Sequence, residues 1–344
     1  MSHQVTVRPT NHQFTVDEGE TVLAAGLRAG VVLAYGCRNG ACGACKGKIV
    51  TGEVDYGKVQ THMLPPYERQ NGFALFCQAT PKSDLVIEAR EVGGTSDIQI
   101  RKLPCRVQSM VRAAPDVMIL RLRLPANERL HFLAGQYVDI LLKDGKRRSY
   151  SMGNPPHSDE FIELHVRNMS HGAFTEYVFD RMKEKDILRF EGPLGTFFLR
   201  EDSDKPMVFV ASGTGFAPVK SVLEHAFFRN IDRQMVLYWG GRRPSDIYMA
   251  DLAGEWQRDH SNFTFIPVIS EPLPEDHWTG RQGFVHHAVM EDFPDLSGYQ
   301  VYACGAPVVV ESAHRDFTSR CGLPDDEFYS DAFTPSADGT KTPA

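Results

Sequence analysis

The chain has 344 residues, of which 42% are hydrophobic and 24% are charged, and its formal net charge is −7. This length is sufficient for two or three domains with separate cores. The acidic balance disfavours nucleic acid as a partner, because phosphate binding requires a basic surface. The excess of acid lies in residues 94–344, since residues 1–93 carry as many Lys and Arg as Asp and Glu.

The first residues, MSHQVTVRPT, lack the basic and then apolar pattern of a secretory signal. No apolar run approaches the roughly 18 residues that suggest a membrane span. We therefore expect neither a signal peptide nor a membrane span, and we expect a cytosolic, reducing location.

Residues 1–93 are predicted to form the first domain. The expected elements are strands at residues 4–8, 13–16 and 85–92 and a helix at residues 21–29 that ends at Gly30. The sequence Gly93, Gly94, Thr95, Ser96 then predicts a flexible connection, and the linker is placed at residues 94–102.

Cysteines in this first domain carry the clearest chemical pattern of the chain. Cys37, Cys42 and Cys45 lie in the glycine-rich loop GCRNGACGACKG, and Cys77 follows about thirty residues later. The spacing C-x4-C-x2-C with a distant fourth cysteine is typical of a plant-type [2Fe-2S] cluster. We expect all four thiolates to hold the cluster while backbone N–H groups of the loop point at the sulfurs, a close wrapping for which glycine is suited.

A zinc site and a set of disulfides are the alternatives for these cysteines. Structural zinc usually takes two separated pairs of ligands, whereas here three cysteines share one loop. The remaining cysteines are Cys105, Cys304 and Cys321, and the odd total of seven argues against a disulfide framework. The pattern therefore favours a cluster that carries single electrons.

Residues 103–203 are predicted to form a small antiparallel barrel. Short strand patterns follow one another with turn residues between them, and a single helical pattern is inserted. The expected strands are residues 105–113, 117–124, 136–142, 148–152, 161–167 and 186–195, and the helix is residues 173–182.

Residues 204–333 are predicted to form a doubly wound α/β domain with a parallel sheet. Continuous apolar runs, typical of strands buried on both faces, alternate with segments long enough for helices. The expected strands are residues 206–211, 235–240, 263–269 and 300–305, and an amphipathic helix is expected at residues 219–228. The final residues, 334–344, are expected to be a disordered tail.

The barrel carries one set of residues suited to an anionic dinucleotide. Arg148, Ser149, Tyr150 and Ser151 lie on one expected strand, Arg167 ends the next, and residues 172–175 begin the helix. Guanidinium and backbone N–H groups bind pyrophosphate, and an aromatic ring packs on a flat cofactor. Taken alone, this signal is weak, because two arginines on a barrel more often belong to a solvated surface.

The α/β domain carries a second set. Gly213, Thr214 and Gly215 come directly after an apolar strand and directly before a helix, which is the context of a phosphate-binding glycine turn. Trp239-Gly240-Gly241-Arg242-Arg243 and Tyr302-Ala303-Cys304-Gly305-Ala306-Pro307 end later strands at the same sheet edge, where open α/β sheets bind ligands.

In chain order, the cysteine pattern, R-x-Y-S, G-T-G-x-x-P and C-G-x-P resemble the ferredoxin–NADP reductase superfamily, in the form fused to an N-terminal plant-type ferredoxin. The resemblance covers residues 3–333. Members include reductase components of bacterial oxygenases and CDP-6-deoxy-glucoseen reductases, and stretches such as YGCRNGACGACKG, FEGPLGTFFLRE, YWGGRR and VYACGAP resemble the latter type most. The resemblance implies a β-grasp ferredoxin domain, FAD in the barrel and a nicotinamide nucleotide in the α/β domain.

The resemblance also implies roles for individual residues. Those expected to bind FAD are Arg148, Ser149, Tyr150, Ser151, His165, Val166, Arg167, Gly172, Ala173, Phe174, Thr175 and Phe333, with Ser151 near the flavin N5 atom. Those expected around the nicotinamide nucleotide are Gly213, Thr214, Gly215, Pro218, Gly240, Arg242, Arg243, Cys304, Gly305 and Pro307. Ser151 and Cys304 would tune the geometry of hydride transfer and form no covalent intermediate. Two positions depart from the family pattern, His171 and Ser212, since glycine is common at both.

A nicotinamide delivers two electrons as a hydride and a cluster accepts one, so a flavin must stand between them. The resemblance thus implies an oxidoreductase that passes electrons from NADH through FAD and the cluster to a separate catalytic protein. That protein would be a deoxysugar dehydrase or a Rieske or di-iron oxygenase; NADPH is a less favoured donor, although Arg242 and Arg243 are compatible with a 2′-phosphate. A non-enzymatic iron–sulfur redox sensor is the remote alternative.

Two adjacent histidines lie outside these patterns. His286 and His287 are expected to point apart, unlike the i, i+4 pairs that share a helix face and bind metal, and we assign them a structural role.

Overall fold

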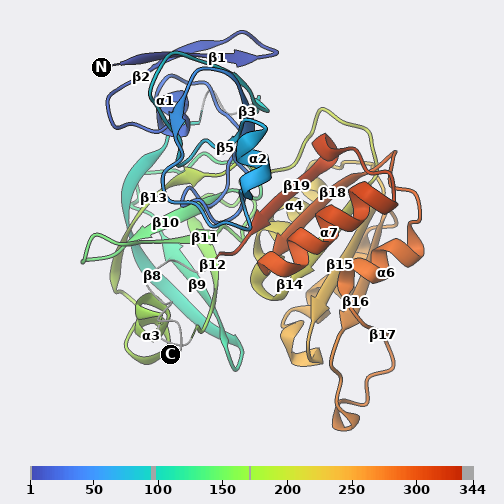
Figure 1. The fold of residues 1–344 in the computed structure, drawn as a ribbon. Coiled ribbons are helices and arrows are strands. Elements are labelled where there is room, and N and C mark those ends of the chain that lie inside the picture. Colours follow the sequence, from blue (N-terminus) through green and yellow to red (C-terminus); the bar gives the residue numbers. More distant parts are fainter. Residues whose placement is uncertain (1, 94–97, 170–171, 335–344) are drawn as a thin grey trace, which may run out of the picture. The chain divides into compact units, whose positions relative to one another are not determined.

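The computed structural model describes residues 2–93, 98–169 and 172–334. The chain divides into two compact units, Met1–Gln99 and Ile100–Ala344, and Figure 1 shows the elements of each. Within the described ranges, none of the helices combines the length and the apolar character that crossing a membrane requires. The expectations for Gly94, Thr95, Ser96, His171 and the tail from residue 335 fall outside the described residues.

The first unit is built on a five-stranded mixed sheet in the order β2-β1-β7-β3-β5. Strands β1 and β7 are parallel, and the other neighbours are antiparallel. This is the predicted β-grasp arrangement. The elements of the unit are β1 (His3–Arg8), β2 (Gln13–Val16), α1 (Val22–Arg28), β3 (Lys46–Thr51), β4 (Val54–Asp55), α2 (Pro66–Gln70), β5 (Phe73–Leu75), β6 (Thr80–Pro81) and β7 (Leu85–Glu88).

Helix α1 has the ends that its sequence predicts. The Thr21 hydroxyl accepts a hydrogen bond from the Ala24 N–H at 3.3 Å, which satisfies one of the unpaired donors of the first turn. Gly30 follows the last turn with φ +78°, a left-handed conformation that glycine adopts without steric cost. The strand expected at residues 85–92 is shorter than predicted, since β7 ends at Glu88.

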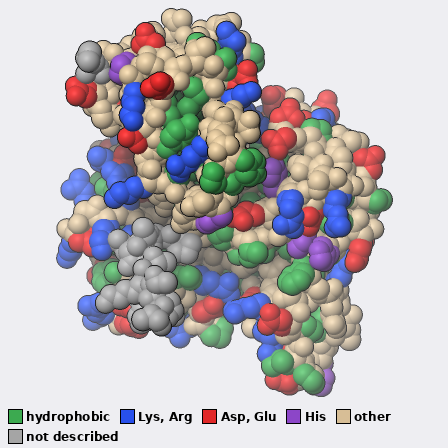
Figure 2. Space-filling view, viewed as in Figure 1, with side chains coloured by type: hydrophobic (Ala, Val, Ile, Leu, Met, Phe, Trp, Pro, Cys, Tyr) green, Lys and Arg blue, Asp and Glu red, His purple; other side chains and the backbone are tan. Residues whose placement is uncertain are grey.

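The second unit begins with an antiparallel barrel whose strand order is β11-β10-β13-β8-β9-β12. A bridge between Met152 and Leu164 joins the two edge strands and closes it. The turn between β10 and β11 is basic, and Figure 2 shows Lys and Arg side chains gathered over this hairpin. The elements are β8 (Arg101–Ala114), β9 (Val117–Arg123), β10 (Tyr137–Leu141), β11 (Arg147–Ser151), β12 (Phe161–Arg167), α3 (Ala173–Asp180) and β13 (Ile187–Leu194).

The barrel is followed by a six-stranded sheet, all parallel, in the order β17-β16-β15-β14-β18-β19. The chain order reverses between β14 and β18, so the sheet is doubly wound and has its switch point there. The elements are β14 (Met207–Ser212), α4 (Phe216–Phe228), β15 (Met235–Gly241), α5 (Ala250–Asp259), β16 (Phe263–Ile269), β17 (Arg281–Gln282), α6 (Val285–Asp292), β18 (Gln300–Gly305), α7 (Pro307–Arg320) and β19 (Phe328–Ala332).

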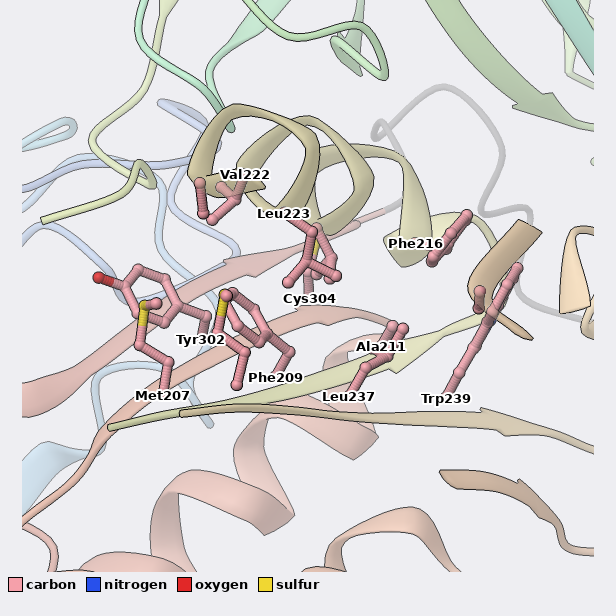
Figure 3. Close-up of a cluster of buried hydrophobic side chains, with 14 of the residues drawn as sticks. Met207, Phe209, Ala211, Phe216, Val222, Leu223, Leu237, Trp239, Tyr302 and Cys304 are labelled. Atoms are coloured by element: carbon pink, nitrogen blue, oxygen red, sulfur yellow. The ribbon is translucent and has the colours of Figure 1, made fainter. Parts of the chain in front are cut away.

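Both faces of this sheet are buried. Along β14, Met207, Phe209 and Ala211 belong to the core on one face, and Val208 and Val210 to the core on the other. Figure 3 shows the first of these cores, with Val222 and Leu223 of α4 packed over the sheet. Burial on both faces explains why the strand sequences are continuous apolar runs without alternation.

Helix α4 starts earlier than its apolar pattern predicts. It begins at Phe216, whereas the expected helix begins at residue 219. The Phe216 ring stacks on Trp239 of β15 with 3.8 Å between centroids, and both side chains are fully buried. Tertiary packing therefore fixes the first turn directly behind the Gly213–Gly215 turn.

Candidate functional site

The four predicted cluster ligands lie together in the first unit. Cys37, Cys42 and Cys45 come from the loop between α1 and β3, and Cys77 follows β5. Their thiols interact as two pairs, Cys37 with Cys42 and Cys45 with Cys77, and Cys37 is also close enough to Cys77 for their charges to interact. The structure thus brings together all four cysteines that the spacing selected.

Backbone N–H groups are directed at these sulfurs. The Cys37 N–H donates to the Cys42 sulfur at 3.3 Å. A hydrogen bond with Cys42 lowers the pKa of Cys37 against the effect of burial, and the N–H groups of Asn39, Ala41 and Cys42 lower it further. A loop that stabilises thiolates in this way suits a negatively charged iron–sulfur cluster.

Two glycines make the loop geometry possible. Gly40 has φ +80° and Gly43 has φ +75°, both in the left-handed region. A Cβ on Gly40 would lie 2.8 Å from the Lys58 carbonyl oxygen. The N–H of Gly40 is also hydrogen-bonded to the Cys77 sulfur, so this position contributes a donor as well as a turn.

On the barrel, alternate residues of β11 face opposite ways. Tyr150 packs against Phe174 of α3 with 5.4 Å between ring centroids, and burial raises its pKa. The Ser149 hydroxyl instead donates to Asp139 of β10 at 2.7 Å. Strand geometry therefore places Arg148 with Tyr150, and Ser149 on the other side.

Predicted residues at the end of β12 have distinct environments. Val166 is fully buried in the barrel core, so its side chain is committed to packing. Arg167 donates to Asp116 at 2.7 Å and to Asp246 of the α/β domain at 2.9 Å, and its side chain is 26% exposed. Its guanidinium thus links the barrel to the nucleotide-binding side and lies next to Gly213, where a Cβ would meet it at 2.5 Å.

The start of α3 is the remaining barrel feature. Gly172 is the N-cap residue, and no described side chain caps the first turn. Ala173 is exposed, whereas Phe174 and Thr175 are buried, and the Thr175 hydroxyl donates to the Gly172 carbonyl oxygen at 3.0 Å. Backbone N–H groups of the first turn of α3 therefore lack a side-chain cap, and they lie at the N-terminal end of the helix, which is the end that attracts anions.

Glycines at the switch point allow two loops to approach closely. Gly215 lies so near β18 that a Cβ would be 2.2 Å from the Cys304 carbonyl oxygen. Gly305 has φ +128° and abuts Ser212, whose hydroxyl accepts a hydrogen bond from the Ala306 N–H at 2.8 Å. Ser212, where glycine is common in the family, therefore connects the end of β14 to the loop after β18 by a hydrogen bond.

Other predicted residues border the same edge. Thr214 is 8% exposed, Pro218 is buried within the first turn of α4, and Pro307 is the first residue of α7. Phe333 follows β19, and its N–H donates to the Gly305 carbonyl oxygen at 2.8 Å. The nicotinamide-side residues thus surround one edge of the sheet, as its topology requires.

An aspartate that the sequence analysis did not select joins the barrel to this edge. The Ser151 hydroxyl donates to Asp331 of β19 at 2.9 Å. Asp331 is the register partner of Cys304, whose pKa is raised by burial and then by this carboxylate, so Cys304 remains a neutral thiol. The only sequence clue to Asp331 is its position two residues before Phe333 in the stretch SDAF.

The two arginines after β15 differ in their partners. Arg243 donates two hydrogen bonds to Asp276, at 2.8 and 2.9 Å. The Arg242 side chain is 68% exposed, and its Nε lies 3.8 Å from Asp246. Gly240, just before them, packs against Val285, where a Cβ would be 2.9 Å away.

A buried polar network around His165, which the sequence analysis expected to bind FAD, links the barrel to the α/β domain through Glu163, Lys220 and Tyr248, which the sequence analysis did not select. His165 contacts Tyr248 at 2.7 Å and Glu163 at 3.1 Å. Lys220 of α4 lies 3.1 Å from Glu163 and donates to the Gly153 carbonyl oxygen at 3.1 Å. Burial opposes ionisation of Glu163, but His165 and Lys220 outweigh it and lower its pKa, whereas burial lowers the pKa of His165.

The expectation for the adjacent histidines is wrong in its geometry. The rings of His286 and His287 do not point apart, and their centroids are 4.2 Å from each other. Both residues lie in the first turn of α6, where the backbone begins to curl and Phe284 packs beside both rings. Burial lowers the pKa of His286 and the neighbouring His287 lowers it further.

These features define a reductase with an iron–sulfur domain, a flavin domain and a nicotinamide nucleotide domain. The chain matches the 2Fe-2S iron-sulfur cluster binding domain family at residues 5–82, the oxidoreductase FAD-binding domain family at residues 104–199 and the oxidoreductase NAD-binding domain family at residues 209–315.

Relatives match along the whole chain. The chain is 42% identical to the CDP-6-deoxy-L-threo-D-glycero-4-hexulose-3-dehydrase reductase of Yersinia pseudotuberculosis, over 98% of this chain and 100% of that protein. It is 37% identical to a terephthalate 1,2-dioxygenase reductase component of Comamonas, over 99% of this chain and 100% of that protein. The crystal structure of the Amycolatopsis cytochrome P450 reductase GcoB superposes with a TM-score of 0.78 at 34% identity, covering 97% and 99% of the two chains.

The chain belongs to the ferredoxin-fused branch of the ferredoxin–NADP reductase superfamily. It is an NAD(P)H-dependent oxidoreductase with domains for a [2Fe-2S] cluster, FAD and NAD, as predicted. The alternative of a non-enzymatic sensor is therefore wrong.

Proposed function

We propose that the protein takes a hydride from NADH and passes electrons one at a time, through FAD and the [2Fe-2S] cluster, to a separate catalytic protein. The observation that supports this most is the hydrogen bond from Ser151 to Asp331, since it brings the predicted flavin side of the barrel to the switch point beside Cys304. FAD, when bound there, supplies the conversion between two-electron and one-electron transfer.

In this proposal the four cysteines hold the cluster and the barrel holds FAD. Arg148 and Tyr150 contact the flavin nucleotide, Ser151 lies near the flavin N5, and the start of α3 binds the pyrophosphate. We also propose domain limits of 1–93, 103–203 and 204–333. The matched family ranges 5–82, 104–199 and 209–315 lie inside these limits. A cytosolic location suits the reduced thiols that the cluster requires.

NADH is the proposed donor because carboxylates already neutralise Arg243, one of the two arginines that are compatible with a 2′-phosphate. Arg243 is bound in bidentate fashion by Asp276, and Glu275 lies 3.8 Å from it. A bidentate guanidinium–carboxylate pair is strong and specific, and a dianionic phosphate would have to displace it. We expect kcat/KM for NADH to exceed that for NADPH at least tenfold.

The test measures kcat/KM for both nucleotides with ferricyanide as acceptor, in the wild type and in Asp276→Asn. The substitution removes one negative charge beside Arg243 and should raise the relative use of NADPH. Arg242→Ala serves as the matched variant, because its exposed guanidinium has no bidentate partner among the described residues. A wild type that uses NADPH as well as NADH would contradict the choice of donor.

We propose a deoxysugar dehydrase as the electron acceptor. The support is the 42% identity to a hexulose-3-dehydrase reductase over nearly the whole chain, against 37% for a dioxygenase reductase. The second candidate is a Rieske or di-iron oxygenase component. Anaerobic NADH oxidation by the purified protein, measured with a purified hexulose-3-dehydrase and its sugar nucleotide, should be at least tenfold faster than with an oxygenase component. The reverse order would select the second candidate.

A further inference from the structure

Three metal-ligating side chains meet between α6 and α7, and none of the three is among the residues assigned to the cofactors. His286 and His287 lie in the first turn of α6, and Asp316 lies in the second half of α7. One ligand atom from each residue can be chosen so that all lie within 4.8 Å of one another. Figure 2 shows histidine side chains gathered on the surface over α6 and α7.

The distances are close to those of a metal site. Bonds of roughly 2.1 Å from zinc to nitrogen or oxygen place neighbouring ligands of a tetrahedron roughly 3.4 Å apart. The His286 Nε2 and the Asp316 Oδ2 are already 3.5 Å apart. Rotation of the exposed His287 ring toward them would complete a three-ligand face around one ion.

Burial distinguishes this cluster from a chance surface grouping. His286 is 8% exposed and Asp316 is 7% exposed, while His287 is open to solvent. Packing therefore fixes His286 and Asp316, and His287 lies on the solvent side of the site. This division leaves access for an ion and a position for water as a fourth ligand.

Arg315 is the main competitor for the carboxylate. Its Nε and Nη2 donate to Asp316 at 3.0 and 3.2 Å, and its side chain is 66% exposed. A carboxylate that ligates a metal commonly keeps such an outer hydrogen bond, which orients it. One arginine bond can thus persist while the other carboxylate oxygen turns to the ion.

We propose that His286, His287 and Asp316 bind one divalent transition metal ion, with zinc as the best match to two imidazoles and one carboxylate. The ion would join α6 to α7. Helix α7 begins at Pro307, directly after the Cys304–Gly305 end of β18. The bound ion would therefore also restrict the motion of the chain at the switch point.

The test is equilibrium dialysis of the holoprotein against zinc chloride, with metal counted by mass spectrometry. The wild type should bind one zinc more than His287→Gln and Asp316→Asn, or bind it at least tenfold more tightly. His287→Gln is the decisive variant, because the His287 side chain is exposed and belongs to none of the buried cores. His314→Gln is the matched control: it lies on α7, the helix of Asp316, and its ring contacts Asp325 at 2.7 Å and packs against Phe328.

Thermal unfolding gives a second readout. Saturating zinc should raise the Tm of the wild type and of His314→Gln but leave that of His287→Gln unchanged. Equal zinc binding by the wild type and His287→Gln, or absence of zinc binding by the wild type at micromolar concentrations, would overturn the proposal.

Discussion

The cluster loop and the junction between the barrel and the α/β domain place functional side chains in different ways. In the loop, three of four cysteines lie within nine residues, and the backbone itself supplies donors to the sulfurs. At the junction, Ser151, Cys304 and Asp331 come from three strands of two sheets. The first site depends on local chain geometry, whereas the second depends on the topology of a whole unit.

Removing one thiol should have the largest effect, because the local site has no substitute ligand. In Cys42→Ala we expect loss of the cluster and at least a hundredfold loss of NADH-driven cytochrome c reduction, while flavin reduction by NADH stays within twofold. The measurements are the visible spectrum and stopped-flow absorbance.

Cys105→Ala is the matched control for this prediction. Cys105 is also buried, but it lies in β8 of the barrel, and burial raises its pKa to about 12, so it is a neutral thiol. It should keep the cluster and the activity. Retention of a full cluster in Cys42→Ala would show that this loop is not the ligand set.

The junction should instead be sensitive to its buried charges. In Lys220→Met, Glu163 and Glu224 lose their shared cation, and Glu163 is only 3% exposed. Breaking a buried ion pair costs about 3–5 kcal/mol, and Glu163 keeps Arg121 at 3.2 Å and His165 at 3.1 Å, so we expect a loss of stability at or below this range. The unfolding transition of the flavin and nucleotide unit should move down by several degrees. Differential scanning calorimetry measures it.

Lys205→Met tests whether burial of the ion pair causes the loss of stability expected in Lys220→Met. Lys205 also pairs with a glutamate, Glu327, at 2.6 Å, but its side chain is 40% exposed. Exposed pairs contribute little because water already solvates both charges, so this variant should leave the transition nearly unchanged. If both variants lowered the unfolding temperature equally, the buried network would not stabilise the unit more than an exposed ion pair does.

This difference also explains what the sequence could predict. Cysteine spacing and the glycine turn are local patterns, so the cluster ligands and the position of Gly213–Gly215 follow from residues near in sequence. Asp331 is 180 residues from Ser151, and no spacing relates the two. His286 and His287 were misjudged because helix periodicity does not describe side chains in a first turn that also packs against a second helix.

The smallest effect is expected from the hydroxyl that joins the two halves of the junction. In Ser151→Ala the hydrogen bond to Asp331 is lost, and the alignment it supports should slow flavin reduction by NADH roughly tenfold to hundredfold. Ser149→Ala, two residues away on the same strand, removes a hydrogen bond to Asp139 within the barrel and an expected contact to FAD, so at saturating FAD it should slow flavin reduction less than Ser151→Ala does. Stopped-flow flavin absorbance under anaerobic conditions measures both. Equal rates in the two variants would mean that alignment at the switch point does not depend on Ser151 but on the close approach of the Gly213–Gly215 turn to Cys304 and Gly305.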